Sequence, residues 1–339
     1  MIIRYKLCPQ QEIYDTMGYQ WISNMMFRQT RNFRSRVCNT DSYGLRFSSS
    51  DLKETIFQQN VSKDKALIVG GTTAFGVGAT SDENTIPGLL SKNSEYFFYN
   101  LGGRAFNGFQ EIILFQSLLD KIEGIKKIIV ISGFNDLYMS FNKNFTSNYP
   151  GPLFLDKKFL DQMNNSDLTL NRKVMKTLIR SKEIDFKNIN KNDLIKYIFD
   201  SKFRKNYKLK TVEPSIDIKN IIKRNLKIWS LISKGLGVEV MFFFSPFIDW
   251  CKDYSKEEEQ LVNYAKNKGS LKYFIKSKNN YQDIRAIFQK QCVNFGMKFY
   301  DCNEHIKLNS KKNDWLFVDS DHLNDNGYKV ISELVRDKV

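Results

Sequence analysis

The sequence has few cysteines, and none of them are paired by spacing. Five cysteines are scattered over 339 residues, an odd number, and no two of them form a Cys-x-x-Cys motif. Zinc sites and disulfide frameworks need cysteines at short, regular spacings, so neither is indicated. This cysteine usage fits a reducing compartment.

Long hydrophobic runs are missing as well. No stretch approaches the length of about 20 apolar residues that a transmembrane helix needs. The first residues, MIIRYKLCPQQE, lack the apolar stretch and small-residue cleavage site of a secretory signal peptide. We therefore expect a cytoplasmic protein without a membrane span.

Several enzyme signatures are absent too. The sequence contains no P-loop, no Gly-x-Gly-x-x-Gly, no His-Glu-x-x-His and no Gly-x-Ser-x-Gly. These absences argue against a nucleotide-binding enzyme, a zinc protease and an α/β-hydrolase with a nucleophile elbow. Only two histidines occur, His305 and His322, so the candidates for acid–base chemistry are few.

Positive charge, by contrast, is abundant. The formal net charge is +15, and residues 141–215 hold 16 Lys and Arg against 8 Asp and Glu. A basic surface can bind nucleic acid, but no RNA- or DNA-binding motif accompanies the charge. The simpler interpretation is a lysine-rich, solvated surface, and a nucleic-acid partner is not expected.

Short apolar runs that end in glycine or polar residues alternate with helical patterns, which indicates βαβ units and a parallel sheet. Five strands are predicted, at residues 66–69, 96–101, 126–132, 238–244 and 297–300. A helix is predicted over 106–121, and others over 216–234, 254–267, 281–294 and the residues after 323.

Two regions stand outside this α/β pattern. Residues 1–62 are predicted to be an N-terminal extension of the domain at 63–339, with one helix over 10–29, because Ile13, Met17, Trp21 and Met25 recur at every fourth position. Residues 141–215 interrupt the pattern just after the third strand as a basic, mostly helical insertion. Either a lid over a site at that edge or a solvated helical excursion would account for it.

Polar groups follow the predicted strands where each strand ends. Thr72 offers a hydroxyl and a backbone N–H on a glycine turn, Gly102 offers an unobstructed N–H, and Asn135 offers an amide. Carboxyl ends of parallel strands meet at one edge, where α/β proteins bind ligands. Three such donors suit an oxyanion, and Asp319 three residues before His322 suits an oriented base. His305 has no such neighbours and is expected at the surface.

These strand-end residues, followed by the Asp319–His322 pair, occur in the order of the conserved sequence blocks of the SGNH (GDSL-type) hydrolase superfamily, which the sequence therefore resembles. Gly70-Gly71-Thr72 stands at its Gly-Asp-Ser block, Asn100-Leu101-Gly102 at its second block, and Gly133-Phe134-Asn135-Asp136 at its Gly-x-Asn-Asp block, while Asp319 and His322 match its Asp-x-x-His block. The resemblance covers residues 66–136 and 216–337. It implies a flavodoxin-like three-layer α/β/α fold and an esterase, lipase or acyltransferase that works without metal or cofactor.

The resemblance also implies roles for single residues. Thr72 would be the nucleophile, His322 the base and Asp319 its orienting acid, with the oxyanion held by Thr72, Gly102 and Asn135. The expected substrate is a small acyl ester, such as an acetylated sugar or glycan precursor. Possible substrate contacts are Arg104, Phe75 and Phe134, although Arg104 also suits a structural role and aromatic residues usually belong to a core.

One difference from the family pattern leaves two functional interpretations open. Serine is the residue of the family's first block, and the extra methyl group of Thr72 restricts its side-chain rotamers and crowds the attacking oxygen. In the first reading the chain is active through Thr72. In the second it is a catalytically silent binding or assembly protein that keeps the same pocket.

Overall fold

The computed structural model describes residues 2–22, 25–58, 61–140, 218–267 and 281–339. The chain consists of two compact units, and all of these residues belong to the unit formed by 1–152 and 216–339. The basic insertion predicted at 141–215 lies outside the described residues.

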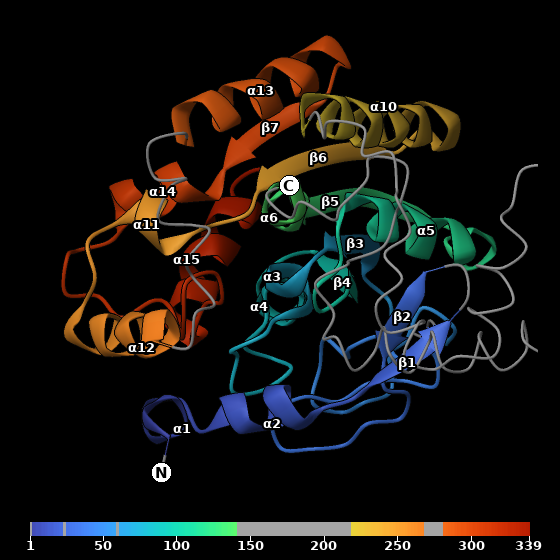
Figure 1. The fold of residues 1–339 in the computed structure, drawn as a ribbon. Helices are drawn as coiled ribbons and strands as arrows, with labels where there is room; N and C mark the ends of the chain where they lie inside the picture. The colour runs from blue at the N-terminus through green and yellow to red at the C-terminus, as the bar shows by residue number, and fades with distance from the viewer. Residues whose placement is uncertain (1, 23–24, 59–60, 141–217, 268–280) are drawn as a thin grey trace, which may run out of the picture. The chain divides into compact units, whose positions relative to one another are not determined.

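A five-stranded parallel sheet forms the centre of this unit, in the order β4-β3-β5-β6-β7 (Figure 1). Its strands are β3 (Asp64–Gly70), β4 (Tyr96–Gly102), β5 (Ile125–Ser132), β6 (Glu239–Phe244) and β7 (Lys298–Asp301). β3, which comes first along the chain among these five strands, lies between β4 and β5, and this is the flavodoxin-like order. The predicted fold class and all five predicted strands are confirmed.

The strands of this sheet are continuous apolar runs because helices cover both faces of the sheet. Ile68 of β3 pairs with Asn100 of β4 on one side and with Ile129 of β5 on the other. Leu67, Ile68 and Ile129 are fully buried. A parallel strand that is buried on both faces reads as a continuous apolar run, which is what the sequence has at each of these positions.

Helices cover the two faces in separate layers (Figure 1). One layer holds α5 (Gly108–Ser117), α10 (Ile218–Leu236) and α13 (Tyr281–Asn294), in which α10 contacts both of the other helices. The other holds α4 (Ile86–Asn93), α14 (Cys302–Asn309) and α15 (Asp325–Arg336). The shorter or peripheral elements are α3 (Thr72–Phe75), η1 (Leu119–Lys121), α6 (Phe134–Ser140), α11 (Ile248–Cys251) and α12 (Lys256–Asn267).

The N-terminal segment differs from the prediction of one helix over 10–29, which is wrong. It contains α1 (Ile3–Leu7), α2 (Gln10–Thr16) and an antiparallel pair, β1 (Tyr19–Ile22) and β2 (Met26–Gln29). Gly18 follows α2 and weakens helix continuation. Pairing also buries Phe27 completely against the ring of Phe106, with the ring centroids 5.6 Å apart, so tertiary packing overrides the four-residue period.

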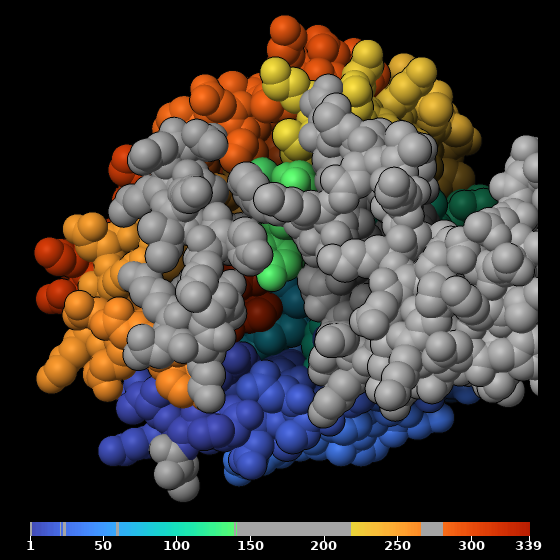
Figure 2. Space-filling model, in the orientation of Figure 1, coloured from blue at the N-terminus to red at the C-terminus, as the bar shows by residue number. Residues whose placement is uncertain are grey.

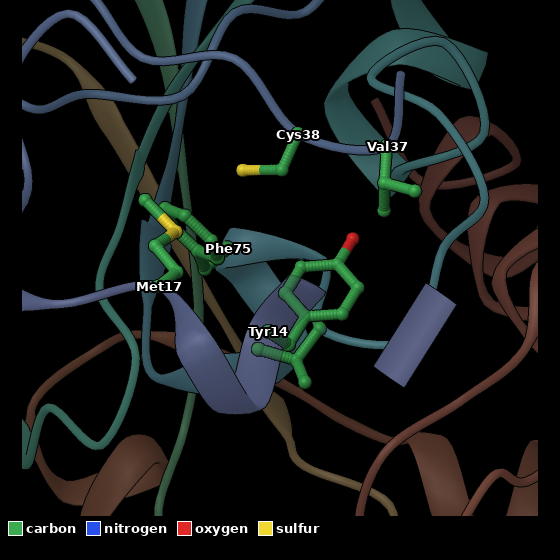
Figure 3. Close-up of a cluster of buried hydrophobic side chains, with 6 residues drawn as sticks. Tyr14, Met17, Val37, Cys38 and Phe75 are labelled. Carbon is green, nitrogen blue, oxygen red and sulfur yellow. The ribbon is translucent and has the colours of Figure 1, made fainter. Parts of the chain in front are cut away.

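A small apolar cluster joins the N-terminal segment to the start of the α/β core. Tyr14 and Met17 pack with Val37, Cys38 and Phe75, and Figure 3 shows these side chains pointing toward one another. The Tyr14 hydroxyl also donates to the backbone oxygen of Ala79 at 2.8 Å. The N-terminal residues, blue in Figure 2, lie along one side of that view, next to the residues of the core.

A buried ion pair supports the same junction. Arg46 Nε lies 2.7 Å from Asp82 Oδ1, and both side chains are almost completely shielded from solvent. The remaining guanidinium nitrogens donate to the backbone oxygens of Val37, Phe75 and Gly76. The ion pair and these hydrogen bonds compensate the buried charge of Arg46 and hold the loop that carries Arg46 in place.

Within the part of the chain that the structure describes, no helix is both long and apolar enough to span a bilayer.

Candidate active site

Two glycine turns bring Thr72 and Asn135 together. β3 ends at Gly70 and the chain turns into α3, which starts at Thr72, while β5 ends at Ser132 and Gly133 leads into α6. Gly133 has a φ of +106°, a conformation that other residues rarely adopt. A Cβ on Gly71 would lie 2.9 Å from Asn135 Nδ2, so the two turns are in close contact.

A pocket opens at this point, between the carboxyl ends of β3 and β5. The strand order reverses there, and open α/β sheets bind ligands in that crevice. The pocket is lined by residues of both turns and of four other segments, namely Gly71, Thr72, Thr73, Phe106, Glu111, Ser132, Gly133, Phe134, Asn135, Ser245 and Asp321.

Asp319 holds the imidazole of His322 in a fixed orientation. Asp319 Oδ2 lies 2.7 Å from His322 Nδ1, and Asp319 Oδ1 accepts the backbone N–H groups of His322 at 2.9 Å and Asp321 at 3.2 Å. Arg4 from α1 reaches the same carboxylate, with its Nη2 3.4 Å from Oδ2. Burial raises the pKa of Asp319, but His322 and Arg4 outweigh that effect and hold it well below its usual value.

A second carboxylate stands at the other nitrogen of the ring. Asp321 Oδ2 lies 3.6 Å from His322 Nε2, an atom that is buried and has no hydrogen-bond partner among the described residues. Burial lowers the pKa of His322, but Asp319 and Asp321 outweigh it and raise the pKa to about 9. The two carboxylates therefore stabilise the protonated form of the imidazole. Asp321 lines the pocket, whereas His322 is not among the residues that line it.

The Thr72 hydroxyl lines the pocket without a hydrogen bond to any described residue, His322 included. In unliganded hydrolases the contact between nucleophile and base is often long and tightens only when substrate binds. Asn135 Nδ2 donates one hydrogen to the backbone oxygen of Phe106 at 2.7 Å, which fixes the amide and leaves its second hydrogen for another acceptor.

Gly102 lies at the end of β4, as the sequence suggested, but its N–H is already bonded. Its N–H donates to Asn100 Oδ1 at 2.9 Å, and a Cβ on it would lie 2.2 Å from the backbone nitrogen of Phe75. The residue thus lets α3 pack closely on β4, and its N–H is not free for an oxyanion. Further along the same loop, Ala105 has a φ of +62°, and its N–H has no partner among the described residues.

Two of the three residues expected to contact substrate are buried and stabilise the fold instead. Arg104 is 4% exposed, and its guanidinium donates to Gln29 Oε1 at 2.7 Å and to backbone oxygens of residues 14, 17 and 18. Phe75 is fully buried in the cluster of Figure 3. Phe134 does line the pocket, and its ring stacks on that of Phe247 at 5.3 Å.

The structure adds residues to the site that the sequence did not indicate. Ser132 is the last residue of β5 and Ser245 directly follows β6, so their positions at the strand ends could have suggested both residues. Asp321 lies inside the Asp-x-x-His block. Glu111 and Arg4 come from helices remote in sequence and carry no such signal. His305, expected at the surface, is partly buried in α14.

One group of side chains in the described part of the chain has the spacing of a cation site. Ligand atoms of Asp319, Asp321 and His322 lie within 4.8 Å of one another. His322 Nδ1 is already bonded to Asp319, however, and the guanidinium of Arg4 lies 3.4 Å from the same carboxylate. These contacts suit an oriented imidazole better than the ligand shell of a metal ion.

No family model matches the sequence, and no curated protein matches it either. The backbone is similar to that of an acetyl xylan esterase, at 11% identity and a TM-score of 0.44, over 81% of this chain and 99% of the other. It is also similar to a lipolytic protein of the G-D-S-L family from Desulfitobacterium hafniense, at 10% identity and a TM-score of 0.42, over 82% and 100% of the two chains. An extracellular lipase from Streptomyces rimosus matches at 12% identity and a TM-score of 0.38, over 81% and 99%.

Proposed function

We propose that this chain is an ester hydrolase or O-acyltransferase that works through Thr72, His322 and Asp319. The observation that carries the proposal is the 2.7 Å contact between Asp319 Oδ2 and His322 Nδ1, beside a pocket lined by Thr72 and Asn135. A carboxylate at Nδ1 fixes the ring so that Nε2 exchanges the proton, and it stabilises the imidazolium that forms.

In the proposed reaction Thr72 Oγ1 attacks the carbonyl carbon of an ester, and its proton passes to His322 Nε2. The tetrahedral intermediate then collapses, the C–O bond to the alcohol breaks, and Nε2 returns the proton to the departing oxygen. Water or a second alcohol attacks the acylated Thr72 in the same way and releases the acyl group. No metal or cofactor is required by these steps.

The charge on the carbonyl oxygen needs hydrogen-bond donors. We assign this role to the N–H of Thr72 and the second hydrogen of Asn135 Nδ2, since both residues line the pocket. In place of Gly102, whose N–H donates to Asn100 Oδ1, we assign the third role to the N–H of Ala105, which has no partner among the described residues and directly precedes the pocket residue Phe106. Losing one such donor typically costs a factor of about 10²–10³ in turnover.

The substrate proposed is a small acyl ester. An acetylated sugar or glycan precursor follows from the resemblance of the sequence blocks to the SGNH superfamily. The pocket offers mainly polar groups with two aromatic rings, Phe106 and Phe134, and suits a short acyl group rather than a long lipid chain.

The alternative, a catalytically silent protein that binds an acylated ligand, has two observations in its favour. Thr72 Oγ1 makes no hydrogen bond to His322, and a pKa of about 9 leaves little neutral imidazole at pH 7 to act as a base. The methyl group of Thr72 adds to the same argument.

Hydrolysis of p-nitrophenyl acetate by four proteins separates the two functions. The wild type should turn over, His322→Ala and Thr72→Ala should each lose turnover by about 10³-fold or more, and Thr72→Ser should retain it. Mass spectrometry should detect an acyl group on the wild type and none on Thr72→Ala. Equal rates in the wild type, Thr72→Ala and His322→Ala would refute the triad. A silent wild type that forms no acyl adduct, beside an active Thr72→Ser, would favour the binding protein.

A further inference from the structure

Glu111 is a carboxyl group at the pocket that the proposed reaction does not use. It lies on α5, its residue is only 1% exposed, and it lines the same pocket as Thr72 and Asn135. Its Oε1 atom accepts a hydrogen bond from Ser132 Oγ at 2.7 Å. Its Oε2 atom is buried and has no partner among the described residues.

The surroundings of Glu111 favour its neutral form. Burial and the nearby Asp136 carboxylate raise the pKa of Glu111 well above its usual value, against the opposing effect of the hydrogen bond from Ser132. No described cation forms an ion pair with it. A neutral carboxylic acid has one O–H donor, and since Oε1 already accepts from Ser132, the proton belongs on Oε2.

A buried donor without an acceptor is costly, so Oε2–H calls for an oxygen that the described residues do not supply. Two serine residues line the same pocket. Ser132 ends β5, and Ser245 follows β6 with a hydroxyl that no described residue engages. We call Glu111, Ser132 and Ser245 the polar floor of the pocket, which Thr72 and Asn135 also line.

We propose that Glu111 donates a hydrogen bond to an oxygen atom on the acyl part of the substrate, so that the pocket selects short 2-oxygenated acyl groups, such as glycolyl, over plain alkyl ones. The proposal rests on the proposed function, which holds the ester carbonyl at Thr72 and Asn135. The acyl group then extends over the polar floor, where an apolar chain would leave Oε2–H without an acceptor.

Two esters of equal shape test this selection. Ethyl glycolate carries a hydroxyl where ethyl propanoate carries a methyl group, and comparing their kcat/KM ratio between proteins cancels their difference in intrinsic reactivity. Glu111→Gln keeps a neutral donor, whereas Glu111→Leu removes it. We expect the ratio to be similar in the wild type and Glu111→Gln, and about tenfold lower in Glu111→Leu, the effect of one hydrogen bond. An unchanged ratio in all three proteins would overturn the proposal.

A binding measurement on the wild type needs neither turnover nor a folded Glu111→Leu. The infrared carbonyl band of a protonated carboxyl, identified by its loss in Glu111→Gln, should shift when glycolamide is added and stay in place with propanamide. Absence of that band, or the same response to both amides, contradicts the role of Glu111. A selective shift in a protein that hydrolyses neither ester would uphold the Glu111 site and refute the hydrolase, whereas hydrolysis without selectivity would uphold the hydrolase and refute the Glu111 site.

Discussion

His322 Nε2 lies 3.6 Å from Asp321 Oδ2, and Nδ1 of the same ring lies 2.7 Å from Asp319 Oδ2. Each ring nitrogen therefore has an acidic group near it, Asp319 at Nδ1 and Asp321 at the nitrogen that would exchange a proton with Thr72. Two carboxylates stabilise the imidazolium more than one does, and the pKa of His322 rises to about 9 in spite of burial. This arrangement sets how the proposed reaction responds to pH.

The pKa values of the two histidines should differ widely. Asp319 and Asp321 raise the pKa of His322 to about 9, while burial lowers the pKa of His305 below 6.5. Because the folded-state pKa of His322 lies above its unfolded value, its contribution to stability is complete below about pH 6.5 and is lost as pH rises through 9. NMR of the ring protons, with His305→Gln for assignment, measures both values. A His322 pKa near 6.5 would contradict the described environment.

Asp321→Asn should move the pH profile of the proposed esterase activity to lower pH. The base must be neutral to accept a proton, so kcat/KM of the wild type should rise with pH through about 9. Removing the Asp321 charge lowers the pKa of His322, and the rise should then begin at lower pH. Profiles of p-nitrophenyl acetate hydrolysis for the two proteins measure this change. Coincident profiles would show that Asp321 does not act on the ring.

Arg104→Ala should destabilise the fold without a specific effect on the site. The guanidinium binds Gln29 and three backbone oxygens of the N-terminal segment, and its removal leaves buried acceptors unpaired. We expect a loss of about 2–4 kcal/mol in the free energy of unfolding. Arg36→Ala, at an exposed arginine, is the matched control and should change stability by less than about 0.5 kcal/mol.

Urea unfolding of both arginine variants measures the loss, and kcat/KM per folded molecule should stay at the wild-type value. A stable Arg104→Ala protein with a raised KM would instead favour the substrate contact.

Ala105→Gly should stabilise the protein. A φ of +62° costs an alanine about 1–2 kcal/mol, and glycine removes that cost while adding some chain entropy to the unfolded state. The expected net gain in the free energy of unfolding is about 0.5–1 kcal/mol. Ala74→Gly, inside the helix α3, is the opposite case and should lose about 1 kcal/mol. Thermal or urea unfolding of the two variants compares them, and a destabilised Ala105→Gly would contradict the backbone geometry.

The strands and the residues that follow them could be predicted because both depend on short stretches of sequence. A parallel strand buried on both faces is a continuous apolar run, and the residue after it must lie at the carboxyl edge, so Thr72 and Asn135 could be placed at one pocket from the sequence. Asp319 and His322 are three residues apart, and their contact needs no long-range information.

The five-stranded sheet, the strand-end residues and the Asp319–His322 pair thus follow from local sequence alone. Long-range packing sets the pairing of β1 with β2, the structural role of Arg104, the bonded N–H of Gly102 and the positions of Arg4 and Glu111 at the site. Each of these depends on which remote segment packs against a residue, and the period of apolar side chains carries no information about that choice.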